Sequence, residues 1–149
     1  MHHFCNALSG RVLVHCAKEC TPDFHYAGNK GAEDAYFRSK LGNLWWVKEW
    51  TKRYKGINAY AVHPGVVASN LGGEASGFAR WVRSKIMIST EEGSQTSLLC
   101  ATQNSLIPGE YYHNTMGHVK LRSDDPGSNT LKAAELWETL EEITADYVE

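Results

Sequence analysis

A tyrosine and a lysine four residues apart, Tyr36 and Lys40, could form a proton-transfer pair. Residues four apart on an α-helix lie on the same face, so both side chains can reach one substrate. A phenol titrates near ~10 in model peptides, and a neighbouring ammonium favours the phenolate. Such a tyrosine can donate a proton to a carbonyl oxygen as hydride arrives, or accept one from an alcohol as hydride leaves. The alternative is an aromatic ring packed beside a solvated lysine.

Strands and helices are predicted to alternate along the 149-residue chain, which indicates an α/β fold with a parallel sheet. The helix that carries Tyr36 and Lys40 is expected at 33–54, after a polar loop at 21–31 and before Gly56. We expect about three parallel strands with flanking helices: strands at 11–16, 57–62 and 110–114, and further helices at 89–103 and 131–147. The last helix is amphipathic, with Leu136, Leu140 and Ile143 on its apolar face.

Several short stretches around the tyrosine–lysine pair follow one another in a recognisable order, at 9–14, 36–44, 56–65, 91–96, 108–112 and 134–137. Together they resemble the short-chain dehydrogenase/reductase family, and within it the branch of the retinol dehydrogenases. The resemblance covers nearly the whole chain but only the second half of the family's fold. It implies a single partial domain over 1–149 with a partial Rossmann-like, doubly wound fold. In that fold, 66–88 would be a flap over the substrate and 131–147 the closing helix.

The resemblance also implies roles for individual residues. Tyr36 would be the catalytic acid/base, and Lys40 would assist it and hold the nicotinamide ribose. The implied cofactor-binding positions are Lys40, Pro64, Gly65, Val67 and Ser69. The cofactor would be NAD or NADP, and the substrate a carbonyl compound or an alcohol. The apolar residues of the 66–88 segment favour a lipid-like or retinoid-like substrate.

Two features of the family pattern are not found at their expected places. The catalytic serine should end the first strand, near Cys16 or Ala17, and neither is a serine. No glycine-rich turn that could hold a pyrophosphate precedes Tyr36; the segment 28–31 is expected to be a flexible lead-in to the helix. Two interpretations therefore stay open. The chain is either part of an NAD(P)-dependent oxidoreductase whose first half precedes it, or a truncated pseudoenzyme without cofactor that serves as a structural subunit of a larger complex.

Composition excludes several other classes of function. A formal net charge of −2 gives no electrostatic reason to expect nucleic acid or an anionic membrane as partner. No apolar run approaches the ~20 residues that span a bilayer, and the first residues do not resemble a signal peptide. The four cysteines are scattered without metal-binding spacing. We expect no metal, and reduced thiols in a reducing compartment, either cytoplasmic or organellar.

Three tryptophans, Trp45, Trp46 and Trp50, lie close together on the predicted helix of Tyr36. Their spacing places at least one ring outside the face that packs on the sheet. An exposed apolar surface of this kind is typical of a protein interface. We therefore expect a protein partner, either a second copy that pairs through this helix or the other members of a larger complex.

Overall fold

The computed structural model describes residues 4–7, 28–68 and 87–147. Four strands form one sheet in the order β1 (Phe4–Ala7), β2 (Ala59–His63), β3 (Tyr111–His113) and β4 (Gly117–Val119). The first three strands are parallel, as predicted, and β4 returns antiparallel to β3. The helices are α2 (Gly28–Arg53), α4 (Thr90–Thr102) and α5 (Thr130–Thr144), with short 3-10 turns η2 (Pro126–Ser128) and η3 (Ala145–Tyr147). The predicted α/β class is therefore confirmed, with one strand more than expected.

The first strand lies earlier in the chain than the sequence indicated. We predicted it at 11–16, where Val12, Leu13 and Val14 form an apolar run, but that segment lies outside the described residues. The strand that pairs with β2 is β1, in the register Phe4 opposite Ala59 to Ala7 opposite Val62. Pairing with a distant strand decided its position, and local hydrophobicity did not.

Helix α2 begins five residues earlier than predicted. The segment 28–31, expected to be a flexible loop, forms the first turn of the helix, so that prediction was wrong. The helix ends at Arg53, and Gly56, with φ of +92°, turns the chain toward β2. Leu44 and Val47 of this helix pack on the sheet, whereas Leu41 and Trp45, one helical turn apart, pack with Ala133.

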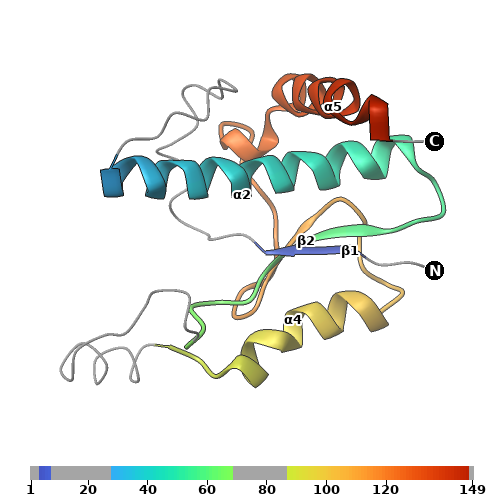
Figure 1. Ribbon diagram of the computed structural model, residues 1–149. Coiled ribbons are helices and arrows are strands. Elements are labelled where there is room, and N and C mark those ends of the chain that lie inside the picture. The colour runs from blue at the N-terminus through green and yellow to red at the C-terminus, as the bar shows by residue number, and fades with distance from the viewer. Residues whose placement is uncertain (1–3, 8–27, 69–86, 148–149) are drawn as a thin grey trace.

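The helices cover both faces of the sheet, with α2 and α5 on one side and α4 on the other (Figure 1). All five residues of β2 are buried, and its side chains alternate between the two faces. Ala59 and Ala61 pack with residues of α2, whereas Tyr60 and Val62 pack with Cys100 of α4. This three-layer arrangement accounts for the near-continuous apolar sequence of the central strand.

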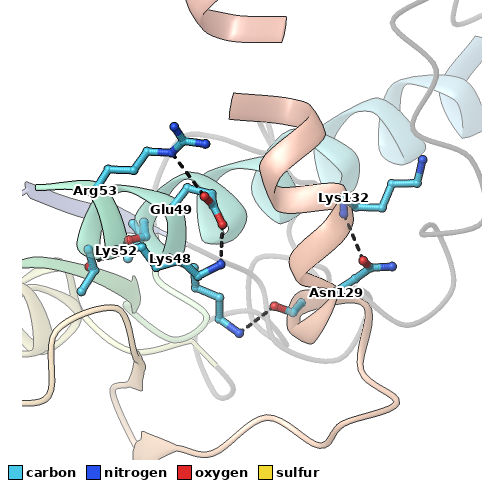
Figure 2. Close-up of polar contacts among 9 residues, drawn as sticks. Lys48, Glu49, Lys52, Arg53, Asn129 and Lys132 are labelled. Carbon is cyan, nitrogen blue, oxygen red and sulfur yellow. Dashed lines mark hydrogen bonds and ion pairs between the residues drawn. The ribbon is translucent and has the colours of Figure 1, made fainter. Parts of the chain in front are cut away.

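The η2 turn, just before α5, is held to α2 by two hydrogen bonds, and α5 itself packs on α2 through apolar side chains. The Trp45 indole Nε1–H donates to the Pro126 carbonyl at 2.9 Å, and the Lys48 ammonium donates to the Gly127 carbonyl at 2.7 Å. Asn129 caps α5 by accepting from the Lys132 N–H at 3.0 Å (Figure 2). Ala133 and Trp137 are the buried residues of α5.

The apolar face predicted for α5 needs a correction. Leu136 and Leu140 are only partly buried, and the Ile143 side chain is 60% exposed. The buried positions, Ala133 and Trp137, lie one helical turn apart and face α2. The contact with α2 therefore centres on the tryptophan, and the leucines border it.

Helix α4 begins where the sequence predicts. The Ser89 hydroxyl accepts from the Glu92 N–H at 3.1 Å, and the Glu92 carboxylate accepts from the Ser89 N–H at 2.8 Å. This capping box satisfies two backbone donors at once. The Ser89 backbone N–H lowers the pKa of Glu92 by stabilising its carboxylate. In the described part of the chain, no helix is both long and apolar enough to cross a bilayer.

Candidate active site

Tyr36 and Lys40 lie on one face of α2, in its N-terminal half. The Lys40 ammonium nitrogen is 5.2 Å from the centroid of the Tyr36 ring. Helix α2 runs opposite to the parallel strands, so this half of it lies near the carboxyl ends of β1 and β2 (Figure 1). In open α/β sheets, ligands bind at that edge. The structure therefore brings the two predicted residues together at the edge where a substrate would bind.

Tyr36 is 41% exposed, so part of this residue lies at the surface of the protein. The Phe37 ring meets the Tyr36 ring edge-on, with centroids 5.6 Å apart. Within the described residues, the Lys40 ammonium, which has three N–H donors, forms no ion pair and contacts the face of the Tyr36 ring. The pair thus combines a partly exposed tyrosine with an ammonium group that lies over its ring.

The turn after β2 holds the next predicted residues, Pro64 and Gly65. The Gly65 N–H donates to His63 Nδ1 at 2.8 Å, and the Asn114 N–H donates to the His63 carbonyl at 3.0 Å. Gly65 has φ of +89°, and a Cβ there would come within 2.9 Å of Ile88 Cδ1. Only glycine suits this backbone conformation, so the turn presents a bare backbone at the carboxyl edge of the sheet.

Val67 fixes the end of this turn to the segment that precedes α4. Val67 and Ile88 form an isolated parallel bridge: the Ala68 N–H donates to the Ile88 carbonyl, and the Ile88 N–H donates to the Val66 carbonyl, both at 2.9 Å. Inside α4, the buried Gly93 leaves room for Val67, since a Cβ there would lie 2.5 Å from Val67 Cγ2. Ser69, the last predicted cofactor-binding residue, lies outside the described residues, as does most of the predicted flap.

Two histidines stack at the ends of β2 and β3, directly beside this turn. The His63 and His113 rings have centroids 4.5 Å apart and are inclined by 14°. Burial, together with the neighbouring His113, lowers the pKa of His63 to about 4, and burial also lowers the pKa of His113. Both rings are therefore neutral near pH 7, which leaves His63 Nδ1 free to accept from Gly65.

A second polar contact crosses from α4 to the same edge. The Thr96 hydroxyl donates to Asn114 Oδ1 at 2.9 Å, and Asn114 in turn holds the His63 carbonyl. Sequence reasoning did not find His113, Asn114 or Thr96. A sequence signal for the two histidines existed, because each stands at or next to the end of a predicted strand. In the structure they are opposite each other in the β2–β3 register. The contact of Thr96 depends on the position of α4 and has no local signal.

The position of β1 changes where a serine should be sought. The expected position near Cys16 or Ala17 was derived from a strand at 11–16, whereas β1 ends at Ala7. In the sequence, Leu8 and Ser9 follow that strand directly. A serine therefore does stand two positions after the strand, although Ser9 itself lies outside the described residues.

Within the described residues, no group of three histidine, cysteine or acidic side chains could hold a metal ion. Each of the stacked histidines uses its Nδ1 atom as a hydrogen-bond acceptor: His63 accepts from the Gly65 N–H, and His113 accepts from the Thr115 N–H at 3.1 Å. Cys100, which forms no disulfide, is buried in the core between α4 and the sheet.

No family model matches the chain. Retinol dehydrogenase 11 of Mus musculus is 35% identical to it over 112 residues, which are 70% of this chain and 34% of that protein. Retinol dehydrogenase 12 of Mus musculus is 43% identical over 84 residues, and that of Homo sapiens 42% over the same length. Part of this chain is homologous to retinol dehydrogenases of the short-chain dehydrogenase/reductase family. The matched residues are about a quarter to a third of the length of these relatives.

Proposed function

We propose that this chain carries the acid/base part of an NAD(P)-dependent oxidoreductase that interconverts a carbonyl compound and the corresponding alcohol. The observation that carries the proposal is the pair of Tyr36 and Lys40 on one accessible face of α2, at the carboxyl edge of the sheet. The homology to retinol dehydrogenases supports it and points to a lipid-like or retinoid-like substrate.

In this proposal, the Tyr36 hydroxyl donates a proton to the substrate carbonyl oxygen, or accepts one from the alcohol in the reverse direction. The Ser9 hydroxyl, two positions after β1, donates a hydrogen bond to the same oxygen. The bound NAD(P) supplies or accepts the hydride. Its ribose hydroxyls would be held by Lys40, whose ammonium has three donors and no partner in an ion pair within the described part.

The turn after β2 fits a flat ring of a cofactor. Gly65 holds a backbone conformation that favours glycine, and the Ile88 side chain packs against the side of the turn where a Cβ would lie, which fixes the turn next to the sheet edge. We propose that Pro64, Gly65 and Val67 form the wall on which the nicotinamide lies, with Ser69 near its carboxamide or phosphates. The neutral His63 holds the Gly65 N–H and so keeps this wall in place. The segment 66–88 would close over the substrate.

Exchanging Tyr36 for phenylalanine tests the mechanism, because it removes only the hydroxyl. With all-trans-retinal and NADPH or NADH, we expect Tyr36→Phe to lower kcat at least ~100-fold, the usual range for a lost acid/base group, while the Kd of the cofactor stays within ~2-fold. Tyr54→Phe is the matched control, because Tyr54 is a similarly exposed tyrosine, 43%, at the far end of the same helix. Undiminished turnover of Tyr36→Phe would remove Tyr36 from the mechanism.

A second proposal concerns assembly. The rings of Trp46 and Trp50 on α2, and of Tyr54 just after it, remain partly exposed beside α5. This surface suits a contact with another protein. The chain would then be a structural, non-catalytic subunit of a larger complex, or it would pair with a second copy of itself. In that case, exchanging Trp46 and Trp50 for alanine releases the protein from its complex, and Tyr36→Phe does not. Native mass spectrometry of the protein from its source distinguishes the two proposals.

A further inference from the structure

An aromatic groove lies between the C-terminal halves of α2 and α5. Its volume is about 510 Å³, and its walls include Trp46, Trp50, Tyr54, Trp137, Leu140 and Glu141. The groove residues Trp46 and Trp50 lie ten and fourteen positions after Tyr36 on α2, about 15 and 21 Å along the helix at 1.5 Å per residue, so the groove lies apart from the candidate active site. Its occupant is therefore a separate question from the chemistry at Tyr36.

The ring faces in this groove are suited to binding a cation. The rings of Trp46, Trp50, Tyr54 and Trp137 lie with centroids 4.4–6.4 Å apart. The Arg53 guanidinium already stands over the Trp137 ring, 5.1 Å from its centroid. Aromatic faces attract cations through their quadrupole, most strongly where water is excluded. Arg53 is also held by Glu49 at 3.3 Å (Figure 2), so it lies at the border of the groove and does not fill it.

The side of the groove formed by α5 is acidic. Glu141 lines the groove, and Glu138, Glu142 and Asp146 are exposed near it on the same end of the chain; none of the four forms an ion pair with another described residue. Glu138 lies three and four positions before Glu141 and Glu142, so these like charges repel one another along the helix. Glu141 and Glu142 also lie in the last turn of α5, where no basic residue offsets the negative end of the helix dipole. A cationic partner would relieve both unfavourable interactions.

Apolar side chains continue the groove toward the C-terminal end of α5. Ile143 is 60% exposed and Tyr147 is 85% exposed, three and seven positions after the groove residue Leu140. Ile143 lies in the last turn of α5, and Tyr147 lies in η3, which follows that helix directly. A surface that extends beyond the groove suits a polypeptide better than a small ammonium compound.

We propose that the aromatic groove binds a basic segment of a partner protein, in which an apolar anchor side chain is flanked by lysine or arginine. The anchor enters the groove among the tryptophans, and the flanking cations pair with Glu138, Glu141 and Glu142. This inference goes beyond the oxidoreductase proposal and does not depend on it, because no residue of the groove takes part in the chemistry at Tyr36.

Two synthetic 14-residue amphipathic peptides test the proposal: they share the same leucine positions, but one carries lysine and the other glutamate at every polar position. The readouts are tryptophan fluorescence and the NMR signals of the indole N–H groups. We expect saturable shifts of Trp50 and Trp137 with the lysine peptide, a Kd that rises with salt, and no shift with the glutamate peptide. Equal binding of both peptides, or no saturable shift, would overturn the proposal.

Variants locate the binding. Exchanging Glu138, Glu141 and Glu142 for glutamine should raise the Kd of the lysine peptide at least fivefold, whereas Glu91→Gln, an exposed acid on α4, should leave it unchanged. Tyr54→Ala removes a partly exposed wall of the groove at little risk to the fold and should also weaken binding. If the triple variant binds as the wild type does, the acidic side is not the site. If sedimentation shows wild-type dimers that Tyr54→Ala abolishes, the occupant is a second copy, and the proposal fails.

Discussion

At the scale of single residues, His63 connects the strand end, the turn and the neighbouring strand. Its ring is 7% exposed, stacks on His113, and accepts a hydrogen bond from the Gly65 N–H through Nδ1. Protonation would convert that acceptor into a donor facing another N–H. The neutral state of this one imidazole is therefore part of what holds the turn that carries Pro64 and Gly65.

The stability of the protein should for this reason depend on pH in the mildly acidic range. The pKa of His63 is lowered in the folded state to about 4 from 6.5, so between these values the unfolded chain binds more protons. The free energy of unfolding should fall as pH falls from about 6.5 to about 4, by up to ~3 kcal/mol at 1.36 kcal/mol per unit. Urea unfolding at pH 7.5, 6.0 and 4.5 measures it.

His63→Gln supplies the control for this pH dependence. The variant should be less stable at pH 7.5 but lose less stability on acidification, because only His113, whose pKa burial also lowers, still contributes at this place. An unchanged slope in the variant would show that the pH dependence has another source.

The candidate site illustrates what residue patterns can and cannot predict. Tyr36 and Lys40 were found from the sequence because their proximity is a property of one helix, with fixed spacing. The contact of Thr96 with Asn114 joins α4 to the residue after β3, and the stack of His63 on His113 joins two strands. Such contacts depend on how distant elements pack, and no local pattern encodes that packing.

At the scale of the elements, two glycines inside helices differ in what they contribute to the stability of the fold. Gly93 of α4 is buried, and a Cβ there would overlap Val67 Cγ2 at 2.5 Å. Gly42 of α2 has only Leu136 Cδ2 near, at 3.5 Å, an ordinary contact distance. The first glycine allows a helix to approach the turn after β2, whereas the second only weakens its helix.

The same substitution should thus change stability in opposite directions. We expect Gly93→Ala to lower the free energy of unfolding by ~1–3 kcal/mol, because Val67 must move in a packed place. Gly42→Ala should raise it by ~0.5–1 kcal/mol through better helix propensity. Thermal unfolding followed by circular dichroism compares the two, and a loss of stability in both variants would contradict this account of Gly42.

Helix boundaries were predictable where a cap marks them, as at Ser89 and Glu92. The errors occurred where tertiary contacts outweighed local pattern. The apolar run at 12–14 indicated the first strand, but the short segment Phe4–Ala7 pairs with β2, and the polar, glycine-containing segment 28–31 is helical. Strand pairing and the continuation of a long helix are decided by partners that a sequence window does not contain.

At the scale of the whole molecule, the described tryptophans report on one layer only. Trp45, Trp46 and Trp50 lie on α2 and Trp137 on α5, on the same side of the sheet (Figure 1). Val47 belongs to the core on that side, whereas Val62 belongs to the core between the sheet and α4. β2 contributes side chains to both cores, so the layers should unfold together.

Val62→Ala tests this cooperativity. Val62→Ala and Val47→Ala should each lower the free energy of unfolding by ~1–3 kcal/mol. Tryptophan fluorescence should therefore show a similar fall of the urea midpoint in both variants, although no described tryptophan lies on the Val62 side of the sheet. Far-ultraviolet circular dichroism should give the same midpoints. A fluorescence transition that ignores Val62→Ala would mean that the α2–α5 layer unfolds as a separate unit.

The bridge between Val67 and Ile88 also bears on how such a protein can evolve. It joins the chain at Val67 to the chain at Ile88, so the intervening residues begin and end at the same place. The entropic cost of a longer loop grows slowly, by about 0.6 kcal/mol for each doubling of length. Insertions and exchanges between these two anchor points can therefore accumulate without disturbing the turn at Gly65.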